Sequence, residues 1–181
     1  GGKSTLLKLL LGLLTPKSGK IEIDGVSIQK AGLSNYREKI AVVMQDDNLF
    51  SGTIRDNITM FDPSPDEARL KRCTVAASIF NDINGMPMGF SSLVGDMGSS
   101  LSGGQKQRLL IARALYAEPE ILFLDEATSH LDMITERKVN KAIKKLGITT
   151  IMVAHRKETI DLADRIINLA EINTSAKVVT M

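Results

Sequence analysis

The sequence predicts a mixed α/β domain with a parallel core sheet. This expectation depends on three short runs of apolar and β-branched residues, each of strand length, at 40–44, 121–124 and 149–154. Such runs are typical of strands that are buried on both faces, as they are in parallel sheets. The 181 residues suffice for one domain of this kind, which buries about 70 % of the surface of its extended chain.

Composition argues against several classes of function. The net charge of +2 comes from 23 basic and 21 acidic residues that are interspersed, so no surface for nucleic acid or an anionic membrane stands out. The single cysteine, Cys73, cannot form an internal disulfide, and its place in an expected helix favours a reduced structural thiol, which suits cytoplasm. The longest apolar stretch, residues 9–14, is far shorter than the roughly 20 residues that cross a bilayer.

The chain opens on GGKST, which matches the last part of the phosphate-binding loop G-x-x-x-x-G-K-[ST] and runs into a leucine-rich helix expected from Thr5 to about Gly12. In such a loop Lys3 reaches the β and γ phosphates of a nucleotide and Ser4 ligates Mg²⁺. A surface lysine followed by a capping serine is the alternative, and the later motifs disfavour it. The residues expected to bind nucleotide here are Gly1, Gly2, Lys3, Ser4 and Thr5. Because the chain begins inside this motif and without Met, we interpret it as lacking N-terminal residues and expect it to be inactive by itself.

Local patterns divide the chain before residue 105. Residues 20–28 alternate apolar and polar side chains around Asp24 and Gly25, which is typical of a β-hairpin and predicts a small antiparallel patch. Residues 61–100 become helical in pattern, most clearly over 66–80. We therefore expect a single domain over 1–181, in which 1–60 and 105–181 form a core with the β patch and 61–104 form an inserted helical subdomain.

A helix is expected to begin at Ser102 and to run to about Leu115. Ser102 and Gln105 have the S-x-x-Q spacing of a capping box, which marks a helix start. Gly103 and Gly104 leave the backbone N–H groups of that start uncovered, and the positive end of the helix dipole favours an anion such as phosphate. Taken alone, a glycine pair before a helix is more often a plain turn.

Asp125 and Glu126 follow the apolar run 121–124 directly. Ligands of parallel sheets bind at the carboxyl ends of the strands, where these two acids are expected. Successive strand residues point to opposite sides, so the two acids cannot share one role. We assign Asp125 to a Mg²⁺ shell and Glu126 to orienting or deprotonating an attacking water. A solvated acidic pair is the alternative for any isolated Asp-Glu.

After residue 132 the sequence predicts a helix, a strand and a closing segment. The helix is expected over 134–146 and is ended by Gly147, and His155 follows the apolar run 149–154. A lone histidine is usually a structural or surface residue, which is the alternative reading of His155. The tail is expected to add two strands, at 164–169 and 176–179.

Five short segments together resemble the nucleotide-binding domain of ATP-binding cassette (ABC) transporters. In chain order they are GKS at 2–4, LSGGQ at 101–105, ILFLDE at 121–126, SHLD at 129–132 and AHR at 154–156. LSGGQ is close to diagnostic of that family, whereas GKS and an acidic pair after an apolar run are not. The resemblance covers essentially the whole chain and implies a P-loop NTPase (RecA-like) core sheet, a small antiparallel β patch and an inserted α-helical subdomain.

The resemblance implies ATP and Mg²⁺ as cofactors, with Ser4, Gln45 and Asp125 around the metal. It implies that Gln45 senses the γ-phosphate and that His155 is a γ-phosphate switch beside the catalytic Glu126. It places Ser102, Gly103, Gly104 and Gln105 against the nucleotide of a second copy, and Asp132 among the nucleotide-binding residues. His130 stands where the commoner family pattern has alanine, and we assign it no chemistry.

The same resemblance implies partners and a cargo. A second nucleotide-binding domain, a membrane-spanning domain in the same chain and a place at the cytoplasmic face of the inner membrane are expected. Residues 44–58, 84–98, 129–137 and 154–160 resemble peptide exporters that secrete colicin V-like bacteriocins, which implies an exported peptide and a peptidase domain upstream. The alternatives are a multidrug or lipid exporter, an ABC ATPase without a transport role, and an inactive fragment.

Overall fold

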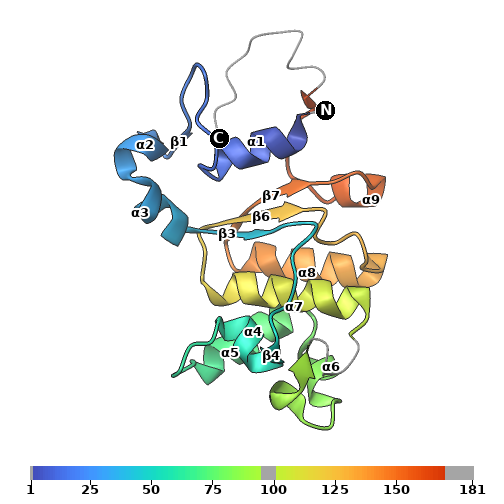
Figure 1. Cartoon of the computed structure of the whole chain (residues 1–181). Coiled ribbons are helices and arrows are strands. Elements are labelled where there is room, and N and C mark those ends of the chain that lie inside the picture. Colours follow the sequence, from blue (N-terminus) through green and yellow to red (C-terminus); the bar gives the residue numbers. More distant parts are fainter. Residues whose placement is uncertain (1, 95–100, 170–181) are drawn as a thin grey trace. The chain divides into compact units, whose positions relative to one another are not determined.

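The computed structural model describes residues 2–94 and 101–169, and the chain divides into two compact units. Of the described residues, one unit comprises 2–39 with 163–169, and the other comprises 40–94 with 101–162 (Figure 1). The strand expected at 176–179, and Gly1 of the phosphate loop, lie outside the described residues. Within the described ranges, no helix combines the length and the hydropathy that crossing a membrane requires.

The first unit contains a helix, a hairpin and two short helices. They are α1 (Lys3–Leu10), β1 (Glu22–Ile23), β2 (Val26–Ser27), α2 (Ile28–Ala31) and α3 (Leu33–Glu38). The predicted hairpin is confirmed, because β1 and β2 pair antiparallel and both turn residues, Asp24 and Gly25, have positive φ of 50° and 77°. The paired part is shorter than predicted, since Ile28 already begins α2.

The end of α1 is fixed to α3. The Tyr36 hydroxyl donates to the Leu10 carbonyl at 2.7 Å, and the Arg37 guanidinium donates to the Gly12 carbonyl at 3.2 Å. Gly12 has a φ of +66°, and a Cβ there would lie 2.8 Å from the Leu33 side chain, so this turn requires glycine. The predicted stop of the first helix near Gly12 is therefore confirmed, although the helix begins at Lys3 rather than Thr5.

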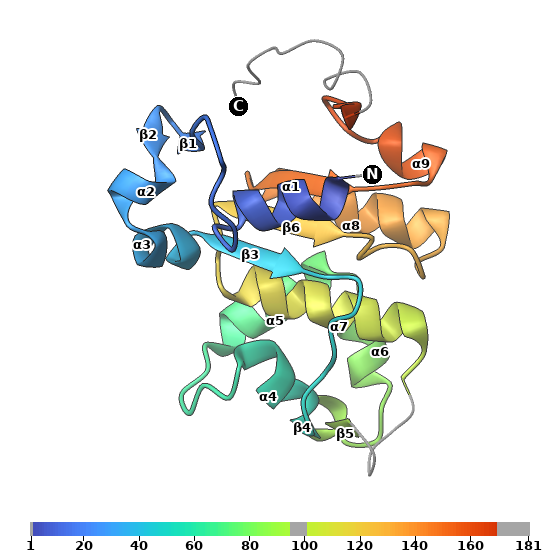
Figure 2. The ribbon, with the colours of Figure 1, turned by 45° about the horizontal axis from the view of Figure 1, so that its top comes forward.

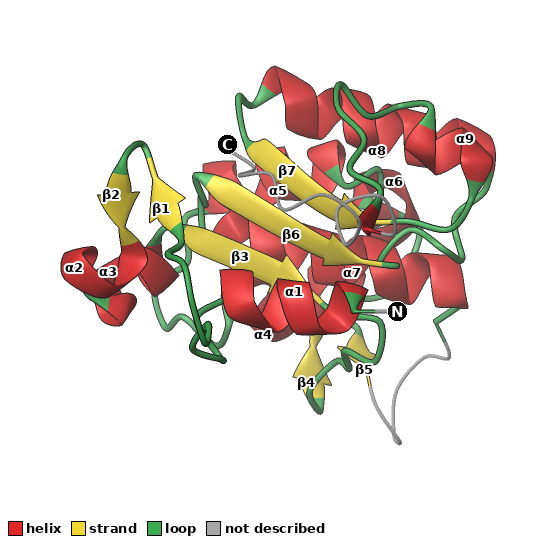
Figure 3. Cartoon of the chain, turned by 90° about the horizontal axis from the view of Figure 1, so that it is seen from above, coloured by secondary structure: helices red, strands yellow, loops and turns green. Residues whose placement is uncertain are grey.

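A three-stranded parallel sheet organises the second unit. Its strands are β3 (Ile40–Val43), β6 (Ile121–Asp125) and β7 (Thr149–Val153), in the order β3-β6-β7, and their arrows point the same way in Figure 3. The three predicted strands are confirmed. Leu122, Phe123 and Leu124 of the central strand are 0 %, 1 % and 2 % exposed. β3 is more open than predicted, with Val42 37 % exposed, because it lies at an edge of this sheet.

Helices cover one face of this sheet in two layers. Those of this unit are α4 (Ile54–Thr59), α5 (Glu67–Ala76), α6 (Phe80–Asn84), α7 (Gly103–Tyr116), α8 (Met133–Lys145) and α9 (Lys157–Ile160). Next to the sheet lie α7 and α8, and α4 and α5 lie beyond α7 (Figures 1 and 2). The second unit also contains a 3-10 turn (Gly89–Ser91) and two short strands, β4 (Gly52–Thr53) and β5 (Leu93–Val94), which pair antiparallel.

The core is centred on α7, whose Leu109, Ile111 and Ala112 are fully buried. The helical stretch predicted over 66–80 is confirmed but is split into α5 and α6, because Ser78 adopts a positive φ of 56°. Cys73 on α5 is a buried free thiol, as predicted. Burial raises the pKa of Cys73 to about 12, which keeps the thiol protonated and unreactive.

The prediction for the segment after residue 162 is wrong in its described part. Residues 163–168 form neither strand nor helix, and Leu169 is helical. Ile166 and Ile167 are 62 % and 41 % exposed, so the apolar side chains that suggested a strand are not packed as they would be in a sheet. By contrast, the helix expected over 134–146 is present as α8, and Gly147 ends it with a φ of +72°.

Candidate active site

The carboxyl ends of the three parallel strands carry residues that the sequence predicted for catalysis and for Mg²⁺. Gln45 comes two residues after β3, Asp125 ends β6, and His155 comes two residues after β7. Because parallel strands end at the same edge of a sheet, these three positions share one edge. Glu126 extends β6 at this edge, where its backbone N–H donates to the Val153 carbonyl of β7 at 3.2 Å.

Glu126 and His155 face one another at this edge. Oε1 of Glu126 lies 3.1 Å from Nε2 of His155, and the two side chains are 28 % and 61 % exposed. Glu126 adopts a positive φ of 51°, a conformation that non-glycine residues rarely take and that is often associated with functional sites. A carboxylate that solutes can reach can orient a water molecule and take its proton. The imidazole beside it can hold a second polar group.

The residues expected around a cation supply oxygen ligands. Asp125 offers a carboxylate and Gln45 an amide oxygen at neighbouring strand ends, and Ser4 offers a hydroxyl in the first turn of α1, in the other compact unit. Within residues 2–94 and 101–169, no group of three or more His, Cys, Asp or Glu is arranged to hold a metal ion. The carboxylate and the amide oxygen at these strand ends are of the kind that Mg²⁺ takes together with phosphate oxygens and water. A place for Ser4 at the same ion stays a prediction.

The described part of the phosphate loop leads directly into α1. Gly2 has a φ of +97°, and α1 begins at Lys3 without a side-chain hydrogen bond to its first amides. Ser4 and Thr5 are exposed in this first turn. A helix start of this form presents backbone N–H groups that suit a phosphate.

The start of α7 has the capping box that the sequence predicted. Ser102 Oγ accepts from the Gln105 N–H at 3.2 Å, and Gln105 Oε1 accepts from the Ser102 N–H at 3.0 Å. The glycine pair has a packing role as well. A Cβ on Gly103 would lie 3.4 Å from the ring of His130, and one on Gly104 would lie 3.2 Å from the His130 carbonyl oxygen. The loop that follows Glu126 therefore approaches this helix start closely.

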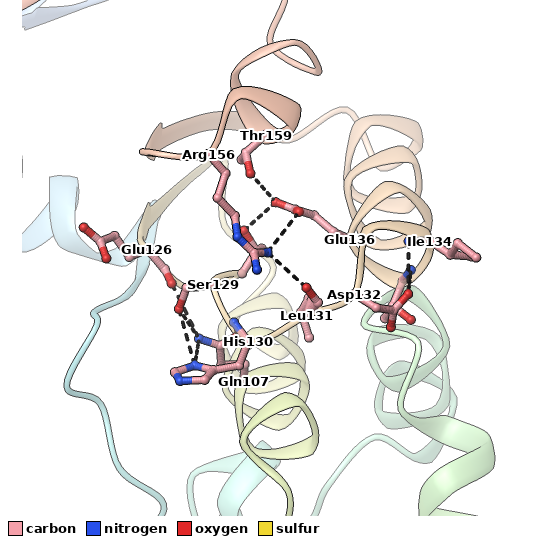
Figure 4. Close-up of polar contacts among 12 residues, drawn as sticks. Gln107, Glu126, Ser129, His130, Leu131, Asp132, Ile134, Glu136, Arg156 and Thr159 are labelled. Atoms are coloured by element: carbon pink, nitrogen blue, oxygen red, sulfur yellow. Dashed lines mark hydrogen bonds and ion pairs between the residues drawn. The ribbon is translucent and has the colours of Figure 1, made fainter.

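Gln107 links α7 to that loop, a contact that the sequence did not predict. Its Nε2 lies 2.9 Å from His130 Nδ1 and 3.1 Å from Ser129 Oγ, and its Oε1 accepts from the His130 N–H at 2.9 Å (Figure 4). The Gln107 side chain is buried, so these contacts satisfy an amide that would otherwise be costly to bury. His130, to which we assigned no chemistry, thus positions the loop on α7.

Asp132, expected among the nucleotide-binding residues, caps α8 here. Its carboxylate accepts from the N–H groups of Ile134 and Thr135 at 3.0 Å and 2.9 Å. The pKa of Asp132 is lowered, mainly by its hydrogen bonds with Thr135. A role at a nucleotide stays a prediction, and the capping bonds show what fixes the side chain of Asp132 in its place.

An ion pair joins the start of α7 to α6. Arg108 contacts both carboxylate oxygens of Asp82, with Nη1 to Oδ2 at 3.0 Å and Nη2 to Oδ1 at 3.1 Å, and Gln105 Nε2 donates to Oδ1 at 3.1 Å. Burial acts to raise the pKa of Asp82. The hydrogen bonds from Arg108 and Gln105, with the charge of Arg108, outweigh it, so the pKa is lowered.

This pair makes stability depend on pH. A carboxyl whose pKa is lowered by folding stabilises the fold above its unfolded pKa, about 3.9, and this contribution is lost as the pH falls through the lowered folded value. We therefore expect Asp82→Asn to lower the melting temperature at pH 7, with the difference from wild type shrinking towards pH 3. Thermal unfolding between pH 3 and pH 7 checks this, with the exposed Asp62→Asn as the control. A difference that stays constant with pH would contradict it.

Comparison with known proteins identifies the family. A family model described as ABC transporter matches residues 1–129. The chain belongs to the ABC transporter family. The resemblance stated from its motifs is thereby confirmed.

Several named relatives are similar over most of this chain. They include the probable microcin-H47 secretion/processing ATP-binding protein MchF (52 % identical) and the colicin V secretion/processing ATP-binding protein CvaB (51 %), both of Escherichia coli. Each match covers 93 % of this chain and 24 % of the relative. An ATP-dependent lipid A-core flippase of Burkholderia pseudomallei is 45 % identical, over 93 % of this chain and 28 % of the flippase. This ABC chain thus spans about a quarter of the length of these relatives.

A solved structure supports the fold of this ABC domain. The structure of a bacterial Atm1-family ABC exporter with ATP bound matches with a TM-score of 0.80 and 38 % identity. The match covers 88 % of this chain and 28 % of that one. The predicted fold class, a P-loop NTPase α/β fold with a parallel core sheet, is therefore confirmed.

Proposed function

We propose that this chain is the ATP-binding and ATP-hydrolysing domain that powers a transmembrane exporter, at the cytoplasmic face of the inner membrane. The observation that carries the proposal is the 3.1 Å contact between Glu126 and His155 at the ends of β6 and β7, directly after Asp125. Family membership supports nucleotide binding, and the contact supplies a group that can activate water next to a group that can hold a phosphate oxygen.

In the proposed reaction the oxygen of a water molecule attacks the γ-phosphorus of ATP, the bond from this phosphorus to the β–γ bridging oxygen breaks in line with the attack, and ADP leaves. Glu126 orients this water and accepts its proton. The Nε2 atom of His155, which faces Glu126 in the structure, donates a hydrogen bond to a γ-phosphate oxygen once ATP is bound. Lys3 offsets the negative charge of the phosphates. Ser4, Gln45 and Asp125 would hold Mg²⁺, which would offset negative charge on the phosphate oxygens.

The start of α7 is proposed to complete the nucleotide site of a second copy. Ser102 and Gly103 are exposed, and the capping box fixes the first turn of a helix whose N–H groups point outward from its positive end. A site shared in this way requires two nucleotide-binding domains to meet.

A membrane-spanning domain is the second proposed partner, and an exposed aromatic patch supports it. Phe50, Met60 and Phe61 are 47 %, 57 % and 51 % exposed, and the rings of Phe50 and Phe61 lie 6.2 Å apart. Arg113 of α7 holds this patch, with its guanidinium 4.8 Å from the Phe50 ring and a hydrogen bond to the Asn48 carbonyl at 3.2 Å. Large exposed apolar side chains held in this way suit a protein interface.

The proposed cargo is a peptide of the bacteriocin class. The two relatives named for secretion and processing of microcin H47 and colicin V are 52 % and 51 % identical, whereas the lipid A-core flippase is 45 % identical. The difference is modest, and it favours a peptide over a lipid.

Reconstitution tests the cargo. In vesicles that contain the full-length protein, we expect a bacteriocin precursor peptide with its leader to raise the rate of ATP hydrolysis, while the same peptide with a scrambled leader leaves the rate at its basal value. The measurement is phosphate release against peptide concentration. Stimulation of ATP hydrolysis by lipid A alone, with no response to the peptide, would instead favour the hypothesis that the exporter carries a lipid.

A further inference from the structure

Glu136 on α8 is a buried carboxylate with an unusual set of partners. Among the described residues it is the one Asp or Glu in the buried class, at 1 % exposure. Its Oε1 accepts from the hydroxyls of Thr128 and Thr159 at 2.7 Å and 2.8 Å, and its Oε2 lies 3.9 Å from Nη1 of Arg156 (Figure 4). These four residues are the Glu136 cluster.

The cluster joins the two chain segments that carry the proposed catalytic pair. Thr128 lies two residues after Glu126, in a turn closed by a hydrogen bond from the Ser129 N–H to the Glu126 carbonyl at 3.0 Å. On the other side, Arg156 directly follows His155, and Thr159 lies in α9. One carboxylate thus bonds to the segment after β6 and to the segment after β7.

Arg156 extends the connection to the loop before α8. Its Nη1 donates to the Leu131 carbonyl at 3.1 Å, next to the capping residue Asp132. The Arg156 side chain is 47 % exposed and its Nη1 lies 3.9 Å from Glu136 Oε2, so its charge contributes little to holding the carboxylate. The two hydrogen bonds from the threonine hydroxyls are short and buried.

Packing alone does not explain a carboxylate at this position. Val139 and Ile143, one and two turns further along the same face of α8, are 0 % and 1 % exposed and apolar. A buried carboxylate is costly unless hydrogen bonds satisfy it, and an apolar side chain in its place would avoid that cost. What the carboxylate adds is a fixed geometry between two loops that an apolar side chain could not hold together.

We propose that Glu136 is a positioning residue for ATP hydrolysis, which holds the segments after β6 and β7 so that Glu126 and His155 keep their mutual geometry. The inference rests on the proposed function, since it assigns Glu136 to the same reaction. Its partners follow the reacting residues in the chain, whereas the phosphate loop at 2–5 belongs to the other compact unit. Loss of the cluster should therefore impair the chemical step and leave nucleotide binding unchanged.

The test compares full-length variants by steady-state ATP hydrolysis. We expect Glu136→Ala to lower kcat by about 10- to 100-fold with KM within about twofold of wild type, because a displacement of about 1 Å at reacting groups can cost about 100-fold. Glu136→Gln keeps an oxygen that accepts from both threonines, so it should restore kcat to within about threefold. Thr128→Val and Thr159→Val should each lower kcat less than Glu136→Ala does.

Matched controls separate positioning from stability. Thr74→Val removes a buried hydroxyl that donates to the Leu70 carbonyl at 2.8 Å inside α5, and Arg137→Ala changes the exposed neighbour of Glu136. Both should leave kcat unchanged. In a Glu126→Gln background, where water activation is already lost, Glu136→Ala should lower kcat by a smaller factor than it does in the wild-type background, because part of its effect passes through Glu126.

The outcomes separate failure of the positioning role from failure of the proposed function. If wild type hydrolyses ATP but Glu136→Ala keeps its kcat, or if the loss is additive with Glu126→Gln, the positioning role is overturned while the proposed function stands. If wild type does not hydrolyse ATP, the proposed function itself fails. Should Glu136→Ala not fold, Thr128→Val and Thr159→Val carry the test, and unchanged kcat in both would also overturn the role.

Discussion

Replacing Glu126 with glutamine in the full-length protein is expected to slow steady-state ATP hydrolysis by about 10²- to 10⁴-fold while ATP binding persists. A general base or water-positioning carboxylate contributes about this factor, and the amide cannot accept the proton. Asp125, Gln45 and the phosphate loop are untouched by the change, so affinity for the nucleotide should hold. The measurements are phosphate release at saturating ATP and equilibrium binding of a fluorescent ATP analogue.

The control for this prediction is Glu120→Gln. Glu120 is exposed and immediately precedes β6, at the end of the strand opposite to Glu126. The control thus makes the same change, from carboxylate to amide, at the end of β6 that lies away from the candidate site. The rate of ATP hydrolysis should therefore be unchanged in Glu120→Gln. Hydrolysis near the wild-type rate in Glu126→Gln would show that another residue activates the water.

The second large effect is expected from mixing two inactive variants. Lys3→Ala removes the phosphate-loop lysine, and Ser102→Arg places a bulky cation in the capping box at the start of α7. Each variant alone should be inactive. If the start of α7 completes the site of a second copy, a mixed dimer of the two variants has one intact site, formed by the phosphate loop of Ser102→Arg and the helix start of Lys3→Ala.

A control dimer carries the same two substitutions, but both in one copy. The variant that carries both Lys3→Ala and Ser102→Arg is paired with a wild-type copy, and each pair is purified through two different affinity tags. Shared sites predict hydrolysis in the pair of single variants and none in the pair of double variant and wild type. Sites contained within one chain predict the reverse pattern, which would refute the shared site.

Local signals in the sequence sufficed for the elements that place the candidate site. The apolar runs at 40–44, 121–124 and 149–154 each became a strand of one parallel sheet, so the shared edge of Gln45, Asp125 and His155 could be predicted. The capping box of Ser102 and Gln105 is a contact over three residues and is found as predicted. Such features depend on neighbours in the chain and are visible in its pattern.

Contacts between distant segments could not be predicted in the same way. Gln107 and His130 are 23 residues apart, as are Glu136 and Thr159, and neither pair has a local pattern. One signal was available for Glu136. The period of Val139 and Ile143 places residue 136 on the buried face of α8, where a carboxylate needs partners.

The strand wrongly predicted at 164–169 shows that a local pattern can also mislead when the long-range contact it needs is missing. Its apolar residues favour a strand locally, yet a strand also needs a neighbour to pair with, and in the described residues Ile166 and Ile167 remain largely exposed. Propensity alone does not supply that neighbour.

A structure of the full-length Glu126→Gln variant with ATP and Mg²⁺ tests the central claim most directly, because this variant should hold ATP without turning it over. We predict a γ-phosphate oxygen within hydrogen-bonding distance of His155 Nε2, about 2.6–3.2 Å, and the side chain at position 126 facing the γ-phosphate across a water molecule. ATP bound with its γ-phosphate away from both residues would contradict the assignment of the Glu126–His155 pair to hydrolysis.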